Sequence, residues 1–208
     1  GSLSLYLAER FPRCRILGVS NSAPQRDFIL ARAAERGLAN LEIETCDMNV
    51  FKTPRRFDRV VSVEMFEAVG ERWWPAWFRT VARNLAPEGR AVVQSITIRD
   101  DLFARYRKGT DFIQQMVFPG GVLPSVAEFR KQAQRAGLEV REAFAFGRDY
   151  ARTLAEWARN FEAAWPEIAR LGFDERFRRL WRFYLAYCEA GFAAGSTDVV
   201  QFELAHAR

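Results

Sequence analysis

The chain has 208 residues, 49% of them hydrophobic and 27% charged, a balance that predicts one globular domain with a sizeable core. No apolar run approaches the roughly 20 residues of a membrane-spanning helix, and the first residues lack the basic and apolar regions of a secretory signal. The net charge of +5 is compatible with binding to nucleic acid, with an anionic membrane surface, and with solvated faces that bind nothing.

The first half of the chain alternates predicted helices with short apolar runs that suit buried strands. The predicted helices cover residues 4–10, 23–36 and 73–85, and the predicted strands cover residues 15–20, 41–46, 57–63 and 90–98. Gly37 stops the second helix, and residues 87–89 are predicted to form a turn. Strands that alternate with helices favour a parallel sheet covered on both faces.

The pattern changes after residue 98. Residues 99–124 break the alternation, residues 126–136 predict a helix, and residues 138–146 predict a strand. Residues 154–194 are helical by pattern and rich in aromatic side chains, and residues 199–205 predict a last strand. The long helical segment fits a lid over the ligand edge of the sheet as well as it fits an ordinary layer of the core.

The positions of the cysteines and of the histidine argue against a metal site and against a mechanism based on imidazole. Cys14, Cys46 and Cys188 are scattered without metal-ligand spacing, so we interpret them as reduced thiols that fill the core. His206 is the only histidine and lies two residues from the C-terminus. We therefore expect no metal site, and no mechanism that depends on an internal imidazole.

Carboxylates follow predicted strands at their carboxyl ends, where open α/β sheets bind ligands. Asp47 could accept from the exocyclic amine of a nucleoside, or it could cap the turn before Phe51. Glu64 and Glu67 both follow the third predicted strand. A carboxylate beside Phe66 in a closed pocket would have its charged form disfavoured by desolvation, as acid–base groups often do. The alternative for each is a surface salt bridge, and we favour it more for Glu64 than for Glu67.

Segments spread along the whole chain carry motifs of one family. They are Gly-Ser-Leu-Ser-Leu-Tyr-Leu-Ala-Glu at 1–9, Val-Ser-Asn-Ser at 19–22 with Gln25, Asp-Met-Asn at 47–49, Phe-Asp-Arg-Val-Val-Ser-Val-Glu-Met-Phe-Glu at 57–67, Phe-Pro-Gly-Gly at 118–121 with Leu-Pro-Ser at 123–125, Tyr-Ala-Arg-Thr-Leu at 150–154, Trp-Pro-Glu-Ile at 165–168 and Tyr-Leu-Ala-Tyr-Cys at 184–188. They resemble the cyclopropane-fatty-acyl-phospholipid synthases, which are class I S-adenosylmethionine-dependent methyltransferases. The first third alone would also fit small-amine N-methyltransferases of the coclaurine type.

The resemblance implies an α/β fold with a Rossmann-like, seven-stranded methyltransferase sheet and a helical lipid-binding insertion before the last strand. Residues 1–208 would form a single domain, with residues 99–124 and 147–196 as insertions over the active site. The first strand would precede Gly1, so we expect the chain to be an N-terminally truncated piece of a longer protein. The strands that flank the missing one, at 15–20 and 57–63, should then stand about 9–10 Å apart, twice the neighbour spacing.

The resemblance also implies roles for individual residues. Those implied to bind the cofactor are Gly1 in the glycine loop, Ser20, Asn21 and Gln25 on the methionine and ribose side, Asp47 and Met48 at the adenine, and Ser62 near the sulfonium.

The residues implied to be catalytic are those that match a bicarbonate site in the family. Glu67 and Tyr150 match ligands of an ion that acts as the base, and Ile96 matches a residue whose backbone holds it. Gln94 stands where the family usually has histidine, so anion binding should be weaker, because an amide cannot become cationic. We expect Glu67, Gln94 and Tyr150 to meet in one small polar pocket walled by aromatics such as Phe66.

The implied reaction is methyl transfer from S-adenosylmethionine to a cis double bond of a lipid acyl chain, giving a cyclopropane or methyl-branched chain. Aromatic side chains would stabilise the intermediate cation. The implied partners are phospholipid acyl chains at a membrane surface, without nucleic acid, and the implied location is cytoplasmic, at the inner face of the membrane. A bicarbonate cofactor and a homodimer are compatible with this reading. The alternatives are N- or C-methylation of a small amphiphile and a non-catalytic lipid-surface protein.

Overall fold

The computed structural model describes residues 1–207, which form two compact units. The first unit is Gly1–Pro54, and the second begins at Arg55. Each unit has its own sheet: β1 (Ile16–Ser20) and β2 (Leu41–Thr45) form one, and β3 (Phe57–Val63), β4 (Leu85–Ile98), β6 (Thr197–His206) and β5 (Leu138–Ala145), in that order, form the other. The strands predicted at 15–20 and 57–63 therefore belong to different sheets, and their expected spacing stays a prediction.

The first unit is a small α/β layer that matches its sequence pattern closely. Its elements are α1 (Ser2–Arg10), β1 (Ile16–Ser20), α2 (Ala23–Glu35) and β2 (Leu41–Thr45). The two strands run parallel, with Ile16 paired with Leu41 and Ser20 with Thr45. Both helices pack on them through a core of Leu5, Ala8, Ile29, Ala33 and Leu41. The parallel pairing brings the carboxyl ends of both strands to one edge.

The sheet of the second unit is mixed: its first two strands follow the predicted parallel pattern, and the two strands after residue 98 add antiparallel pairs. Its strands are β3 (Phe57–Val63), β4 (Leu85–Ile98), β5 (Leu138–Ala145) and β6 (Thr197–His206). β3 is parallel to β4, but β6 runs antiparallel to both β4 and β5. The reason is that the intervening helices return the chain to the same end of the sheet, so that Thr197 starts β6 opposite Ile98.

The prediction of a turn at residues 87–89 is wrong, because these residues lie inside β4. Phe57 of β3 pairs with Leu85, whereas Arg59 pairs with Arg90, so the register shifts between them. The segment with Pro87 and Gly89 is thus absorbed as a bulge, which is where strands tolerate proline and glycine.

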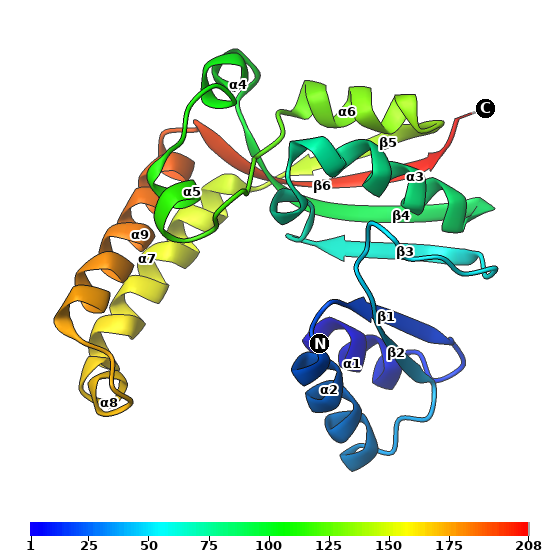
Figure 1. Ribbon diagram of the computed structural model, residues 1–208, viewed down its shortest axis with the longest axis horizontal. Coiled ribbons are helices and arrows are strands. Elements are labelled where there is room, and N and C mark those ends of the chain that lie inside the picture. The colour runs from blue at the N-terminus through cyan, green and yellow to red at the C-terminus, as the bar shows by residue number, and fades with distance from the viewer. Residues whose placement is uncertain (208) are drawn as a thin grey trace. The chain divides into compact units, whose positions relative to one another are not determined.

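An aromatic core lies on one face of this sheet, under α3 (Trp74–Asn84) and α6 (Val126–Arg135) (Figure 1). Phe66, in the 3₁₀ turn Phe66–Val69, is fully buried at its centre. Its ring lies 4.8–5.4 Å, centroid to centroid, from four other rings. Those rings belong to Trp74, Trp77, Phe78 and Phe129. This packing fixes the turn that follows β3.

The helical segment projects from the end of the sheet as two long helices, joined by a short one, with a core of its own (Figure 1). Its elements are α7 (Gly147–Ala163), α8 (Trp165–Arg170) and α9 (Glu175–Ala193). The helix starts earlier than residue 154, because Gly147 N donates to Asp198 Oδ1 at 2.7 Å and so ties its first turn to β6. Leu154, Leu185 and Phe192 are buried between α7, α9 and the sheet.

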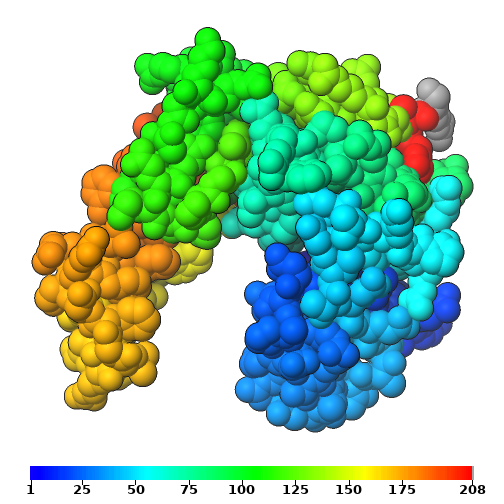
Figure 2. Space-filling model, in the orientation of Figure 1, coloured from blue at the N-terminus to red at the C-terminus, as the bar shows by residue number. Residues whose placement is uncertain are grey.

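Residues 99–124 contain two short helices, α4 (Asp100–Tyr106) and α5 (Phe112–Met116), which the sequence pattern did not predict. The Phe112 ring packs edge-on against Phe183 of α9, with centroids 4.6 Å apart. Figure 2 shows the green surface of this segment against the orange surface of α9. Within residues 1–207, no helix combines the length and apolarity needed to cross a membrane.

Candidate active site

In the first unit, the predicted cofactor residues lie at the carboxyl edge of β1 and β2. Ser20 Oγ donates to Gln25 Oε1 at 2.9 Å, and Ser20 O accepts from Cys46 N at 2.9 Å. Asp47 follows directly and is exposed. Its Oδ1 accepts from Asn49 N at 2.8 Å. One oxygen of the carboxylate therefore caps the turn, as the second of the two predicted roles required.

The other predicted cofactor residues differ in their surroundings. Asn21 is exposed and Met48 half-buried. Gly1 caps α1, and a Cβ atom at Gly1 would lie 2.2 Å from Ile29 Cγ1, so this position has no room for a side chain. In the second unit, the Ser62 hydroxyl on β3 is buried without a hydrogen-bond partner among the described residues.

The chain leaves β3 through a strained residue. Glu64 has a φ of 49°, and it is the single non-glycine residue with positive φ in the described part of the chain. This conformation costs a side chain with a Cβ about 1–2 kcal/mol. Such strain persists where the surroundings over-determine it and is common at functional sites. Here the surroundings are the ladder bond from Glu64 N to Gln94 O, at 2.9 Å, and the buried ring of Phe66.

The Glu64 side chain is the centre of a polar cluster. Its Oε1 accepts from Gln94 Nε2 at 2.7 Å and from the hydroxyl of Tyr150 on α7. Gln94 Nε2 also lies 3.2 Å from the Tyr150 oxygen. Gln201 on β6 donates to Gln94 Oε1 at 2.9 Å, which turns the amide nitrogen of Gln94 toward Glu64. One strand and one helix thus direct donors at this carboxylate, and a second strand orients one of those donors. We name Glu64, Gln94, Tyr150 and Gln201 the Glu64 cluster.

Glu67 forms a second, separate set of contacts. Its Oε1 accepts from Ser95 Oγ at 3.0 Å and from Ile96 N. Ile96 N is the next amide of β4 on the side of β3, so the Glu67 carboxylate replaces the backbone acceptor that β3 no longer supplies. Glu67 Oε2 is buried without a partner among residues 1–207. Burial raises the pKa of Glu67 above its ordinary value, although the hydrogen bonds to the backbone and to Ser95 oppose the shift.

The expected meeting of Glu67, Gln94 and Tyr150 therefore needs a correction. The structure brings Gln94 and Tyr150 together, but the carboxylate bonded to them belongs to Glu64. Gln94 and Ser95 point to opposite faces of β4, and Glu67 bonds to Ser95 and to the Ile96 amide. Glu67 still lies near Tyr150, because its charge contributes to the raised pKa of that hydroxyl. The sequence interpretation missed Glu64 because it favoured a surface salt bridge there. The side-chain alternation at Gln94 and Ser95 was the available signal.

Phe66 does not wall the Glu64 cluster, because it is buried in the core under α3. The rings that contact Tyr150 are Phe146 and Phe192, at centroid distances of 5.8 and 5.4 Å. Burial, and then the hydrogen bond to Glu64, raise the pKa of Tyr150 above its ordinary value. The hydroxyl therefore stays protonated and serves as a donor.

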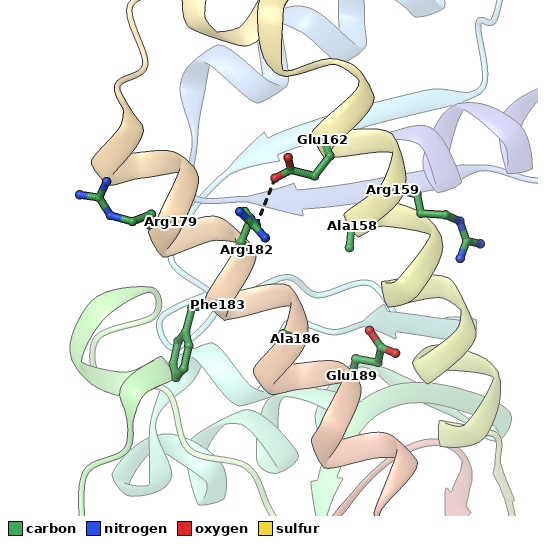
Figure 3. A pocket seen from close by; sticks show the side chains of 8 residues that line it. All are labelled: Ala158, Arg159, Glu162, Arg179, Arg182, Phe183, Ala186 and Glu189. Atoms are coloured by element: carbon green, nitrogen blue, oxygen red, sulfur yellow. Dashed lines mark ion pairs between the residues drawn. The ribbon is translucent and has the colours of Figure 1, made fainter.

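A groove of about 720 Å³ lies between α7 and α9, apart from the Glu64 cluster. Figure 3 shows Ala158 on α7 and Ala186 on α9 among the lining residues, with the Phe183 ring on the side of α9 that faces away from α7. Arg182 reaches across it to Glu162, with Arg182 Nε 3.3 Å from Glu162 Oε1. The small side chains of the two alanines leave the space open, and charged side chains form its rim.

A family model described as mycolic acid cyclopropane synthetase matches residues 1–202. The chain belongs to this family. A tuberculostearic acid methyltransferase of Mycobacterium tuberculosis is 38% identical over 206 residues, which are 98% of this chain and 47% of that protein. The cyclopropane-fatty-acyl-phospholipid synthase of Escherichia coli is 35% identical over 202 residues, covering 97% and 50%. The chain thus spans about half the length of these curated relatives.

A solved structure of a mycolic acid cyclopropane synthase, complexed with SAH and CTAB, superposes with a TM-score of 0.87. The two chains are 25% identical, and the match covers 98% of this chain and 74% of that one. The predicted family and the Rossmann-like methyltransferase fold are thereby confirmed.

The bicarbonate implied for this family does not fit the residues of this member. The donors that would hold it are the hydroxyl of Tyr150, the amide of Gln94 and the backbone of Ile96, and all three already donate to Glu64 or Glu67. The groups of the second unit that donate hydrogen bonds to Glu64 and Glu67 carry no charge. An anion there would meet two carboxyl groups in a partly buried place, which is electrostatically unfavourable.

Proposed function

We propose that this cyclopropane synthetase family member transfers a methyl group from S-adenosylmethionine to the cis double bond of a phospholipid acyl chain. The observation that carries the proposal is the Glu64 cluster, a carboxylate held by two donors at the carboxyl end of β3 and beside an aromatic helical pair. Together with the family membership, this arrangement suits the removal of a proton from an apolar substrate.

The first unit offers polar groups that suit the cofactor. Asp47 is exposed, and its Oδ1 alone is used by the turn, so the carboxylate retains acceptors for an exocyclic amine. Ser20 and Gln25 would serve the methionine and ribose side with Asn21, and Met48 would pack on the adenine. The role implied for Ser62, on β3 of the second unit, stays a prediction. The cofactor supplies the electrophilic methyl group, and these residues bind and orient it.

The second unit offers apolar surface that suits an acyl chain. Phe118, Trp157 and Phe183 are each about half exposed, at 53%, 50% and 52%. Monomeric proteins rarely expose many large apolar side chains together without a function. The groove between α7 and α9 adds small and aromatic side chains to the same helical pair. We therefore assign this pair to the lipid, and we propose that the protein acts at the inner face of a membrane.

In the proposed chemistry, the π electron pair of the double bond would form a bond between one of its carbons and the methyl carbon, while the methyl–sulfur bond breaks and its electron pair stays on sulfur. The other carbon becomes a cation, which nearby aromatic rings stabilise by cation–π attraction. Loss of a proton from the new methyl group, with its electron pair forming a carbon–carbon bond, closes a cyclopropane. If a hydride first shifts from the methyl-bearing carbon to the cationic carbon, the cation lies on the methyl-bearing carbon, and loss of a methyl proton then gives a methylene branch.

The test is mass spectrometry of phospholipids after incubation of the protein with methyl-labelled S-adenosylmethionine. Vesicles of a cis-unsaturated phospholipid should gain one labelled carbon per acyl chain, and vesicles of the saturated analogue should gain none. Label found only on an added small amine, or on neither lipid, would refute the proposal.

A further inference from the structure

Three features of the Glu64 cluster fix the conformation of Glu64 and the orientation of its carboxylate. Glu64 adopts a backbone conformation that a glutamate disfavours, and its side chain is exposed on the surface of the second unit. Oε1 is held by Tyr150 and Gln94, two neutral donors. Gln201 in turn fixes the orientation of the Gln94 amide. An ordinary surface glutamate has none of these constraints.

We propose that Glu64 is the base of the reaction, so that the protein supplies from its own chain the anion that the resemblance assigns to bicarbonate. This inference rests on the proposed function. Tyr150 and Gln94 bind Glu64 Oε1, and Oε2 then accepts the proton of the methylated acyl chain. The C–H bond breaks, its electron pair forms the carbon–carbon bond, and the proton ends on the carboxylic acid of Glu64, which returns it to solvent.

Glu67 is less suited to this role. Its Oε1 is used by Ser95 and by the Ile96 amide, and its Oε2 is buried. Those contacts close the end of the β3–β4 ladder and hold the turn in which both glutamates lie. Glu67 is therefore a positioning residue, whereas Glu64 is exposed enough to meet a substrate.

The glutamine at position 94 agrees with this assignment. A cationic side chain would suit a mobile anion, which must be attracted from solution. A carboxylate built into the chain needs only orientation, and a neutral amide provides that without forming a competing ion pair. The departure from the family histidine and the presence of Glu64 are then two parts of one arrangement.

The experiment measures turnover on cis-unsaturated phospholipid vesicles in buffer depleted of carbon dioxide, with and without added bicarbonate. Wild-type turnover should not depend on bicarbonate. Glu64→Gln should lower kcat by about 10²–10⁴-fold, the usual contribution of a general base, while still accepting the hydrogen bond from Tyr150. Glu142→Gln, an exposed carboxylate on β5, is the matched control and should retain full turnover.

A second variant separates loss of the base from loss of the fold. Glu64→Gly suits the positive φ and leaves Tyr150 and Gln94 free to hold an external anion. Its turnover should be low in depleted buffer and should rise when bicarbonate is added. Thermal unfolding should show that both variants are folded.

Three results would overturn the assignment: wild-type turnover that needs bicarbonate, a Glu64→Gln protein with full kcat, or a Glu64→Gly protein that bicarbonate does not restore. A wild-type protein that methylates no lipid would instead refute the proposed function itself.

Discussion

Replacement of Phe66 by alanine should destabilise the second unit and disturb both glutamates at once. The ring is fully buried and packs against four aromatic rings. Truncation of such a residue costs about 3–5 kcal/mol, as the sum of lost transfer energy and the cavity that remains. A domain is stable by roughly 5–15 kcal/mol, so the variant should fold with little margin. Glu64 and Glu67 flank this ring and would lose the anchor of their turn.

Urea unfolding followed by circular dichroism measures the effect, and Phe144→Ala is the control. Phe144 is an aromatic residue of the same unit, but it is 64% exposed, so its loss should cost less than about 1 kcal/mol. At a temperature where the Phe66→Ala protein is still folded, its turnover should also fall more than that of the control. A Phe66→Ala protein within about 1 kcal/mol of wild type would refute the view that this ring anchors the turn.

Three further predictions concern the cofactor edge and the two sides of β4. Asp47→Ala should weaken S-adenosylmethionine binding by about 1.5–3 kcal/mol, the value of a charge-assisted hydrogen bond, and unchanged affinity in calorimetry would place the adenine elsewhere. Glu67 has a raised pKa, so its contribution to stability is complete below its unfolded value and is lost as the pH rises through the folded value. The stability of Glu67→Gln relative to wild type should therefore increase over that pH range, and parallel unfolding curves would contradict it. Gln94→His should strengthen anion binding, but only when Glu64 is absent.

The sequence predicted the first unit well because local signals agree there. Both strands are short apolar runs, Gly37 follows the end of α2 with a positive φ, and Ser22 caps α2 through its hydroxyl, which accepts from Gln25 N at 3.4 Å. The second unit was predicted less well because non-local contacts decide it. Residues 87–89 contain strong turn formers, yet pairing with β3 holds them within β4. The direction of β6 depends on where α9 ends, which periodicity does not reveal.

The candidate site was predicted only in part: Gln94 and Tyr150 were expected in it, whereas Glu64 and Gln201 were not. Gln94, Ile96, Tyr150 and Glu67 all lie where strand ends and the start of α7 come together. The hydrogen bond between Tyr150 and Glu64 was not predicted, because it depends on the positive φ of Glu64. A glutamate gives no sign in sequence that it will adopt positive φ, whereas a glycine would have done so. That single turn decides which carboxylate faces Gln94 and which faces Ser95.

The prediction for Gln94→His follows from the same pairing and can be made quantitative. In the presence of Glu64, a histidinium at position 94 would pair with that carboxylate, and added bicarbonate should still have no effect. In the Glu64→Gly background the histidinium would face the anion instead. Replacing a neutral donor by a cationic one adds the attraction between two unit charges, about 1 kcal/mol at about 4 Å in water. The difference of about 1 kcal/mol should lower the bicarbonate concentration for half-maximal turnover roughly fivefold at a pH where the imidazole is protonated. Equal concentrations for the single and double variants would show that position 94 does not contact the anion, and that the Glu64 carboxylate and the external ion occupy different places.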